Sequence, residues 1–453
     1  MRRLKTMAKL RPVSHGMRIF TVVWFGQTIS LTGSELTFFA LGVWVYQNTG
    51  SATQFGLIYL FTILPGTLLS PLAGALVDRW SRRWVMIISD TGAALTTLTI
   101  ALLFITDTLE IWHIYLLSAI SSAFSAFQWP AYLASMTLLV PKQYLGRANG
   151  MIQFSDAMAQ LVAPVLGGVL LVTIQLGGVI LLDLATFFIA MVTLLLVRFP
   201  EIKTTVVKKT NNLVSLLHEI TYSWHYLKER PGLLGLLFFF TICYFFEGVV
   251  AVLVTPLILS FSTATVLGTI LSIGGLGMLM GSLLMTTWGG PKRLIYAVFG
   301  FQLLGSLSIL MAGLHTIIPL LALSAFLYYF TVPFTQGCSR AIWQRKTAPD
   351  VQGRVFSIVH MMTWIATPLA YLIAGPLADY VFEPLMATNG YLASSIGQII
   401  GTGPGRGIGL LFIIMAIFSL LATIIAYQYP RLRLVDQELP DVVDDITTTP
   451  QSP

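Results

Sequence analysis

The chain has 453 residues, of which 56% are hydrophobic and only 10% are charged. Its mean hydropathy of +0.81 lies far outside the range of soluble domains. The net charge of +7 would suit a nucleic-acid ligand, but the basic residues are confined to short segments between long apolar runs. Composition therefore excludes a soluble globular protein and predicts an all-α polytopic membrane protein that binds no nucleic acid.

Twelve apolar runs are long enough to cross a bilayer. We place them at about 18–47, 52–77, 84–105, 112–140, 148–173, 178–197, 233–260, 264–288, 294–313, 317–344, 354–379 and 408–428. An even number of spans puts both ends of the chain on one side of the membrane. With the N-terminus inside, Arg406 is the one Lys or Arg in an outer loop. This asymmetry follows the positive-inside rule, so both termini are expected to be cytoplasmic.

A long polar stretch at 198–232 divides the spans into two sets of six. Its apolar residues recur at helical spacing, which predicts an amphipathic helix on the inner membrane surface. We expect a cytoplasmic tail at 1–17, six-helix bundles at 18–197 and 233–429, and a disordered cytoplasmic tail at 430–453. The Gly-rich outer segment 401–407 lacks the Lys-Ser/Thr of a phosphate-binding loop and is predicted to be flexible. Cys243 and Cys338 both fall in apolar runs, so no disulfide or metal site is expected.

The most informative stretch joins the second and third runs and reads Gly74-Ala75-Leu76-Val77-Asp78-Arg79-Trp80-Ser81-Arg82-Arg83. It places one acid among three arginines in a short hairpin that must lie at a membrane face. The carboxylate can pair with the arginines and is favoured near a helix N-terminus. Such contacts would tie helix ends together at that face. The simpler interpretation is an anchor that fixes topology. The candidate gating residues are Gly74, Asp78, Arg79, Arg82 and Arg83.

Small residues gather on the fifth predicted span. They let helix backbones approach closely, and a proline among them bends the helix. The alternative interpretation is a packing face without a specific role. The residues of this candidate helix-packing motif are Gly150, Ala159, Ala163, Pro164, Gly167 and Gly168.

Among the acids within predicted spans four stand out, namely Glu35, Asp156, Asp183 and Glu247. Ionisable side chains inside a membrane are costly and usually mark a pathway. A carboxylic acid in an apolar environment is more readily protonated, which suits a proton-coupling group. The alternative for each acid, and the favoured one for Asp183, is a structural hydrogen bond between helices. Asp90 is shallower and is expected to be an interfacial partner for nearby arginines.

The two sets of six spans also resemble each other. Gly146-Arg147 follows the fourth span and Gly353-Arg354 follows the tenth, and both spans carry a proline. With the loop at 74–83 and the small residues of the fifth span, the chain resembles the major facilitator superfamily. It is most similar to the bacterial multidrug and macrolide efflux branch, whose members exchange drugs for protons. Ser81 stands where the family usually has glycine. The stretch 112–140 also lacks the basic residue that many drug:proton antiporters carry there.

This resemblance implies twelve transmembrane helices in two pseudo-symmetric six-helix halves, with a substrate site between them. It also implies that the loop at 74–83 gates the inner face and that the motif of the fifth span limits leakage. We therefore expect a bacterial inner-membrane exporter of small amphipathic molecules, acting as a monomer without a cofactor. A proton gradient would supply the energy. A lipid or lysolipid flippase, or an uncoupled facilitator, is the alternative. A membrane-embedded enzyme is disfavoured, because no nucleophile with a basic partner lies near one membrane face.

Overall fold

A computed structural model describes residues 13–77, 80–141, 144–197, 224–288, 291, 293–347 and 351–438. Within these residues the chain is helical and contains no β-strand. The predicted amphipathic helix lies mainly outside the described residues, since only its last part, 224–228, is placed and is helical.

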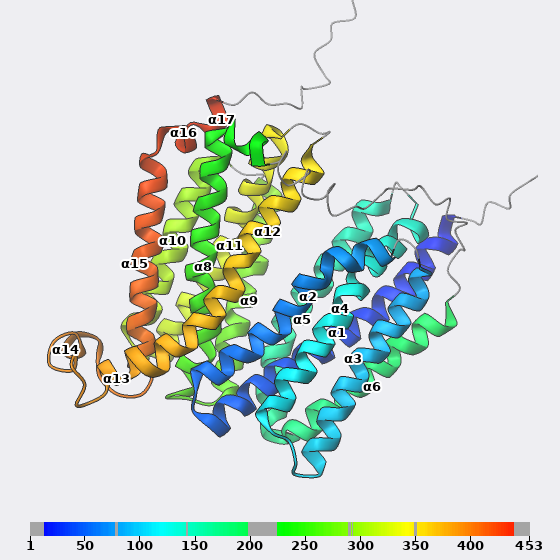
Figure 1. The fold of residues 1–453 in the computed structure, drawn as a ribbon, viewed down its shortest axis with the longest axis horizontal. Helices are drawn as coiled ribbons and strands as arrows, with labels where there is room; N and C mark the ends of the chain where they lie inside the picture. Colours follow the sequence, from blue (N-terminus) through cyan, green and yellow to red (C-terminus); the bar gives the residue numbers. More distant parts are fainter. Residues whose placement is uncertain are drawn as a thin grey trace, which may run out of the picture. The chain divides into compact units, whose positions relative to one another are not determined.

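In the part of the chain that the structure describes, twelve long helices correspond to the twelve predicted spans, and Figure 1 shows their arrangement. They are α1 (Val13–Thr49), α2 (Ala52–Val77), α3 (Arg82–Ile105), α4 (Ile111–Leu139), α5 (Leu145–Thr173), α6 (Gln175–Leu196), α8 (Pro231–Leu259), α9 (Ala264–Trp288), α10 (Leu294–Leu314), α11 (Ile318–Lys346), α12 (Gln352–Pro376) and α15 (Arg406–Gln428). Eleven segments of the described chain are long and apolar enough to cross a membrane. Helix α4 is not among them, because its serines, His113 and Gln128 lower its hydropathy.

The chain forms two compact units, each with its own apolar core. Unit 1 comprises residues 1–45 and 60–206, and unit 2 comprises residues 46–59 and 207–453. In unit 1, α3 packs against α4 and α6. In unit 2, α11 packs against α9 and α10, while α8 packs against α12 and α15. The first two turns of α2 therefore belong to unit 2 and the rest of that helix to unit 1.

The segment between α12 and α15 is folded, so the prediction of a flexible loop at 401–407 is wrong. A π-helical turn (Leu377–Phe382) continues α12 and is followed by α13 (Glu383–Met386) and α14 (Gly397–Ile400). Met386, Ile400 and Leu410 form a small buried cluster there. Gly401, Gly403 and Gly405 have φ angles of +92°, +106° and +79°. These glycines supply backbone conformations that let the segment turn back onto α15.

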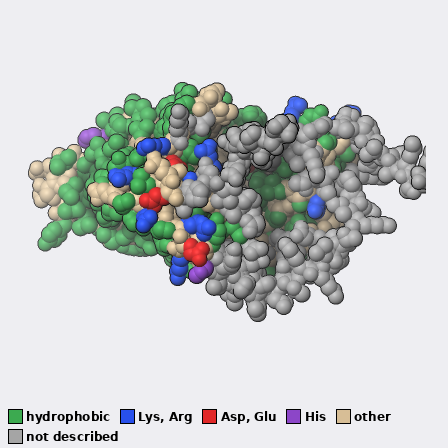
Figure 2. All heavy atoms as spheres, turned by 90° about the horizontal axis from the view of Figure 1, so that it is seen from above, with side chains coloured by type: hydrophobic (Ala, Val, Ile, Leu, Met, Phe, Trp, Pro, Cys, Tyr) green, Lys and Arg blue, Asp and Glu red, His purple; other side chains and the backbone are tan. Residues whose placement is uncertain are grey.

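The beginning of the C-terminal tail is also ordered. Helices α16 (Pro430–Arg433) and α17 (Val435–Glu438) follow α15, and Leu432 and Val435 are buried against α8 and α10. The prediction that the chain is disordered from residue 430 is therefore wrong for 430–438, and 439–453 lie outside the described residues. Figure 2 shows Lys, Arg, Asp and Glu side chains gathered on this end of unit 2. On α16 and α17, Arg431 pairs with Glu438 at 3.1 Å.

Close backbone contact between α9 and α11 gives a test of the packing in unit 2. A Cβ atom at Gly277 would meet the backbone carbonyl of Phe326, which cannot move as a flexible side chain can. We expect Gly277→Ala to destabilise the protein by about 1–3 kcal/mol through overpacking. The measurement is thermal unfolding of purified protein in detergent. Gly300→Ala on α10 is the matched control, because a Cβ there would meet nothing within 4 Å. Equal unfolding temperatures for the two variants would contradict this packing.

Candidate functional site

Two of the four predicted acids meet in unit 1. Glu35 of α1 and Asp156 of α5 are both partly buried. Their side chains are close enough to interact electrostatically, and Asp156 also acts on Tyr132 of α4. The two acids of α1 and α5 therefore share one electrostatic environment in unit 1.

The third acid, Glu247 of α8, belongs to a polar network in the core of unit 2. Gln302 of α10 donates from Nε2 to Glu247 Oε1 at 2.8 Å, and Tyr328 of α11 is a second hydrogen-bond partner. Gln302 also reaches Ser419 Oγ of α15 at 3.5 Å, and Ser419 shares a hydrogen bond of 2.8 Å with Ser306. The hydrogen-bond partners of this carboxylate are neutral, and their amide and hydroxyl groups can serve either of its protonation states.

Asp183 of α6 has a structural environment. It is only 4% exposed, and Ser34 of α1 donates to its Oδ1 at 3.3 Å. A Cβ at the neighbouring Gly33 would meet Thr186 and Asp183, which shows how closely α1 and α6 approach. The interhelical hydrogen bond considered for Asp183 is therefore present.

The prediction that Asp90 is an interfacial partner of arginines is wrong among the described residues. Asp90 is 4% exposed and accepts hydrogen bonds from the amides of Gln27 and Gln128, on α1 and α4. The last two arginines of the loop motif donate hydrogen bonds to backbone carbonyls and not to Asp90. Arg82 donates to the carbonyl of Ala134 at 2.7 Å, and Arg83 donates to carbonyls at the end of α6.

The loop motif is only partly described. Gly74 lies in α2, whereas Asp78 and Arg79 lie outside the described residues. Arg82 and Arg83 begin α3. Arg82 reaches the Ala134 carbonyl in the C-terminal half of α4, and Arg83 reaches the last turn of α6, where backbone carbonyls lack helical partners and the helix dipole favours a cation. The two arginines therefore connect the start of α3 to α4 and to the end of α6 in unit 1.

The small residues of α5 divide into two groups. Ala159 and Ala163 are buried, Gly168 is buried beside Pro164, and a Cβ at Gly167 would meet the ring of Phe39 on α1. Gly150 is exposed, and a Cβ there would meet no described atom within 4 Å. The close contact within unit 1 thus involves the residues from Ala159 onward.

Asp379, which sequence reasoning did not single out, caps the N-terminus of α2 within unit 2. Its Oδ1 accepts from the Ala52 amide at 2.9 Å, and its Oδ2 accepts from the Thr53 amide at 2.8 Å and from Ser51 Oγ at 2.6 Å. Ser51 Oγ in turn accepts from the Gln54 amide at 3.2 Å. The first three amides of α2 are thereby satisfied by one carboxylate and one hydroxyl group. Ser51-Ala52-Thr53 is a typical helix start and so predicts that these amides need a cap. The sequence does not show which acid provides it.

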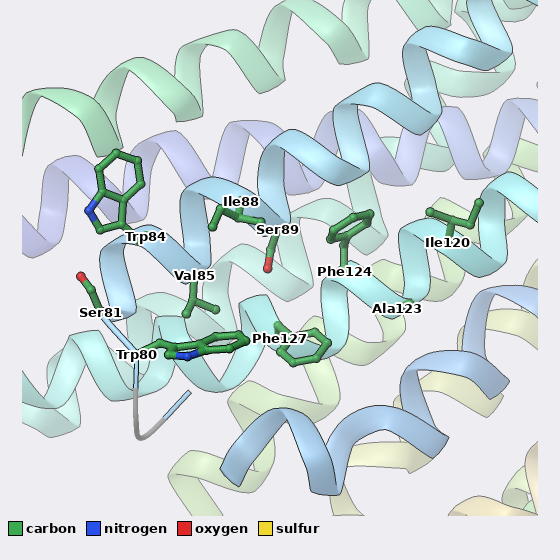
Figure 3. Close-up of a pocket in the computed structure, with 10 residues that line it drawn as sticks. All are labelled: Trp80, Ser81, Trp84, Val85, Ile88, Ser89, Ile120, Ala123, Phe124 and Phe127. Carbon is green, nitrogen blue, oxygen red and sulfur yellow. The ribbon is translucent and has the colours of Figure 1, made fainter. Parts of the chain in front are cut away.

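An apolar pocket of about 620 Å³ lies between α3 and α4 in unit 1 (Figure 3). Its walls are mainly aromatic and aliphatic side chains, including Trp80, Trp84, Phe124 and Phe127. Trp84 and Ile88 are 58% and 60% exposed and begin a line of exposed apolar residues along α3. The pocket therefore opens on a face of α3 that is suited to contact lipid.

The fold and these sites define a multi-pass membrane carrier, with acids buried in helices and charged side chains at helix ends. The comparisons make the class specific. The family model described as Major Facilitator Superfamily matches residues 23–371, so the chain belongs to this superfamily of transporters. Its relatives are transporters and not enzymes, and efflux pumps are among them.

Two named relatives show the branch of the family. The chain is 30% identical over 376 residues to macrolide efflux protein A from Streptococcus pyogenes, covering 80% of this chain and 90% of that protein. It is 22% identical over 435 residues to the multidrug efflux pump Tap from Mycolicibacterium fortuitum, covering 92% and 96%. Among solved structures, a bacterial homologue of the human lysosomal transporter Spinster superposes with a TM-score of 0.70. It is 13% identical and covers 94% of this chain and 98% of its own, which shows the shared fold.

The cap on α2 gives a second test. Asp379→Ala removes the acceptor of three donors, and loss of such a cap costs about 0.5–2 kcal/mol. We expect the amides of Ala52 and Thr53 to exchange with deuterium several-fold faster than in the unmodified protein. Asp436→Asn is the control, because Asp436 caps a different helix by accepting from the Ile295 amide at 3.0 Å. Unchanged exchange at residues 52 and 53 in Asp379→Ala would show that this cap contributes nothing.

Proposed function

We propose that the protein exports small amphipathic molecules across a bacterial inner membrane by alternating access, in exchange for protons. The observation that carries the choice of substrate class is the identity of 30% with macrolide efflux protein A over most of both chains. The protein would act as a monomer in the bilayer, with the proton gradient as its energy source and no cofactor.

The buried acids support proton exchange. Glu247 is surrounded by the side chains of Gln302 and Tyr328, and neither supplies a positive charge. A carboxylate placed in this way is stabilised either by a proton or by a cationic group of a ligand. Substrate and proton would therefore compete for one negative charge, which is the simplest physical basis of antiport. The Glu35 and Asp156 pair offers a comparable site in unit 1.

Substitution of Glu247 tests the coupling. In proteoliposomes with an imposed pH gradient, Glu247→Gln should abolish uphill transport of a lipophilic cation or a macrolide. Downhill movement should persist, because the glutamine keeps the shape of the side chain. Ser306→Ala is the matched control, since Ser306 is in the same buried network but does not titrate. If Glu247→Gln, Glu35→Gln and Asp156→Asn all keep full proton-driven transport, the acids are structural. Movement of lysolipids in the same vesicles, without the cation or the macrolide, would instead support the flippase alternative.

Topology can be tested by labelling. We propose that both termini are cytoplasmic, supported by the charged end of unit 2 at α16 and α17 and by the sequence distribution of Lys and Arg. Both native cysteines are buried and can be replaced. A cysteine at the exposed Thr402 should react with an impermeant thiol reagent in intact cells. A cysteine at the exposed Gln437 should react only after permeabilisation. The opposite pattern would invert the proposed topology.

A further inference from the structure

Asp90 is the centre of a closed ring of hydrogen bonds that links three helices. Gln27 Nε2 of α1 donates to Asp90 Oδ2 at 2.9 Å. Gln128 Nε2 of α4 donates both to Asp90 Oδ1 and, at 2.8 Å, to Gln27 Oε1. Both carboxylate oxygens and both hydrogens of the Gln128 amide are therefore engaged. The ring ties α1, α3 and α4 together, with the acid about 12 Å along α3 from its first residue.

The ring holds a carboxylate without a counter-charge. The other described ionisable side chains on the surrounding helices are Arg18, Glu35 and Tyr46 on α1, Arg82 and Arg83 on α3, His113, Tyr115 and Tyr132 on α4, and Asp183 on α6. None of these forms an ion pair with Asp90 in the described part of the chain. The two nearest arginines along α3 donate to backbone carbonyls. A carboxylate that is 4% exposed and faces only amides is costly as an ion, and a proton relieves that cost.

The same arrangement occurs in unit 2, where it involves different residues. There Glu247 of α8 accepts from Gln302 of α10 at 2.8 Å. Helices α8 and α10 are the first and third long helices of the second set of six, as α1 and α3 are of the first set. In one set the acid is on the third helix and the amide on the first, and in the other set these positions are exchanged. The two compact units thus each join their first and third helices by one carboxylate and one glutamine.

We propose that Asp90 is a proton-binding residue of unit 1. Its protonation would change the hydrogen bonds of Gln27 and Gln128, and through them the contacts of α1 and α4. This inference rests on the proposed exchange of substrate for protons. Binding converts the carboxylate and a proton into a carboxylic acid, and no other bond forms or breaks. In the protonated state that we propose, the proton is on Oδ1 and this oxygen donates to Gln128 Oε1. The Gln128 amide has then turned its Oε1 toward the acid, which ends its donation to Gln27.

This change reaches a part of α4 that is predisposed to bend. Pro130 lies two residues beyond Gln128 and removes one backbone hydrogen bond of the helix. With the carboxylate ionised, the ring fixes α4 to α1 and α3 just before this proline. With the acid protonated, the contact between Gln128 and Gln27 is lost and α4 is held by Asp90 alone. Protonation thus changes which helices are tied together, as a coupling residue requires.

Infrared spectroscopy tests the proton site without requiring transport. A purified, substrate-free sample is compared at acidic and alkaline pH, and the carboxylic-acid C=O band that appears on acidification is recorded. Asp90→Asn keeps the size of the side chain and should lose one component of this band. Glu247→Gln is the matched control and should lose a different component. A titrating band identical in Asp90→Asn and the unmodified protein would overturn the proposal.

A second variant covers the case in which Asp90→Asn does not fold. Gln128→Leu retains the acid but removes its partner on α4, so the Asp90 band should persist at a shifted frequency. An unchanged band would contradict the ring as the site of protonation.

The proposed proton site and the proposed antiport function can be rejected independently of each other. Loss of the Asp90 band in Asp90→Asn, with no proton-driven transport by the unmodified protein, would retain the proton site and reject the antiport function. Proton-driven transport that keeps its full pH dependence in Asp90→Asn would reject Asp90 as a coupling residue and leave the exporter intact.

Discussion

The structure depends on one constraint, which is that backbone groups at helix ends need partners where water is scarce. Carboxylates serve the N-termini, with Asp379 at α2, Glu383 at α15 and Asp436 at α10. Guanidinium groups serve the C-termini. Arg406 is 5% exposed and donates to Gly313 and Leu314 at the end of α10, at 3.0 and 2.8 Å. Each charge has the sign that the helix dipole favours at its position.

Because each cap comes from another part of the chain, the caps also connect helices. Asp379 joins the end of α12 to the start of α2, and a Cβ at Gly375 would meet the Thr53 backbone, so the two helices are in direct contact there. The contact combines these hydrogen bonds with close packing, since a Cβ at Gly56 would also meet the carbonyl of Tyr371. Caps of this kind fix helix ends firmly in one conformation at a modest cost of release.

The sequence predicted the helices closely but not their polar partners. The spans at 52–77 and 264–288 coincide with α2 and α9, and the ends of the other spans differ by only a few residues, because length and hydropathy decide where a helix leaves the membrane. Partners such as Asp379 and Ala52 are far apart in the chain, and no local pattern connects them. The glycines at 401, 403 and 405 favour a flexible segment by sequence alone, yet in the structure they shape a folded turn closed by Glu383 and Arg406. Asp90 was misassigned because arginines were its neighbours in sequence, whereas glutamines are its neighbours in space.

The exchanged positions of acid and amide in the two sets of helices have a physical meaning. If the acid were needed only for hydrogen bonding, a second glutamine would hold α8 to α10 or α1 to α3 at a lower desolvation cost. Each pair instead keeps one group that can lose a proton and one that cannot. The glutamine can present either its oxygen or its nitrogen, so it pairs with the acid in both protonation states. A carboxylate beside an amide is therefore a contact with two stable arrangements that differ by one proton, and the fold provides this contact between the first and third helices of each set.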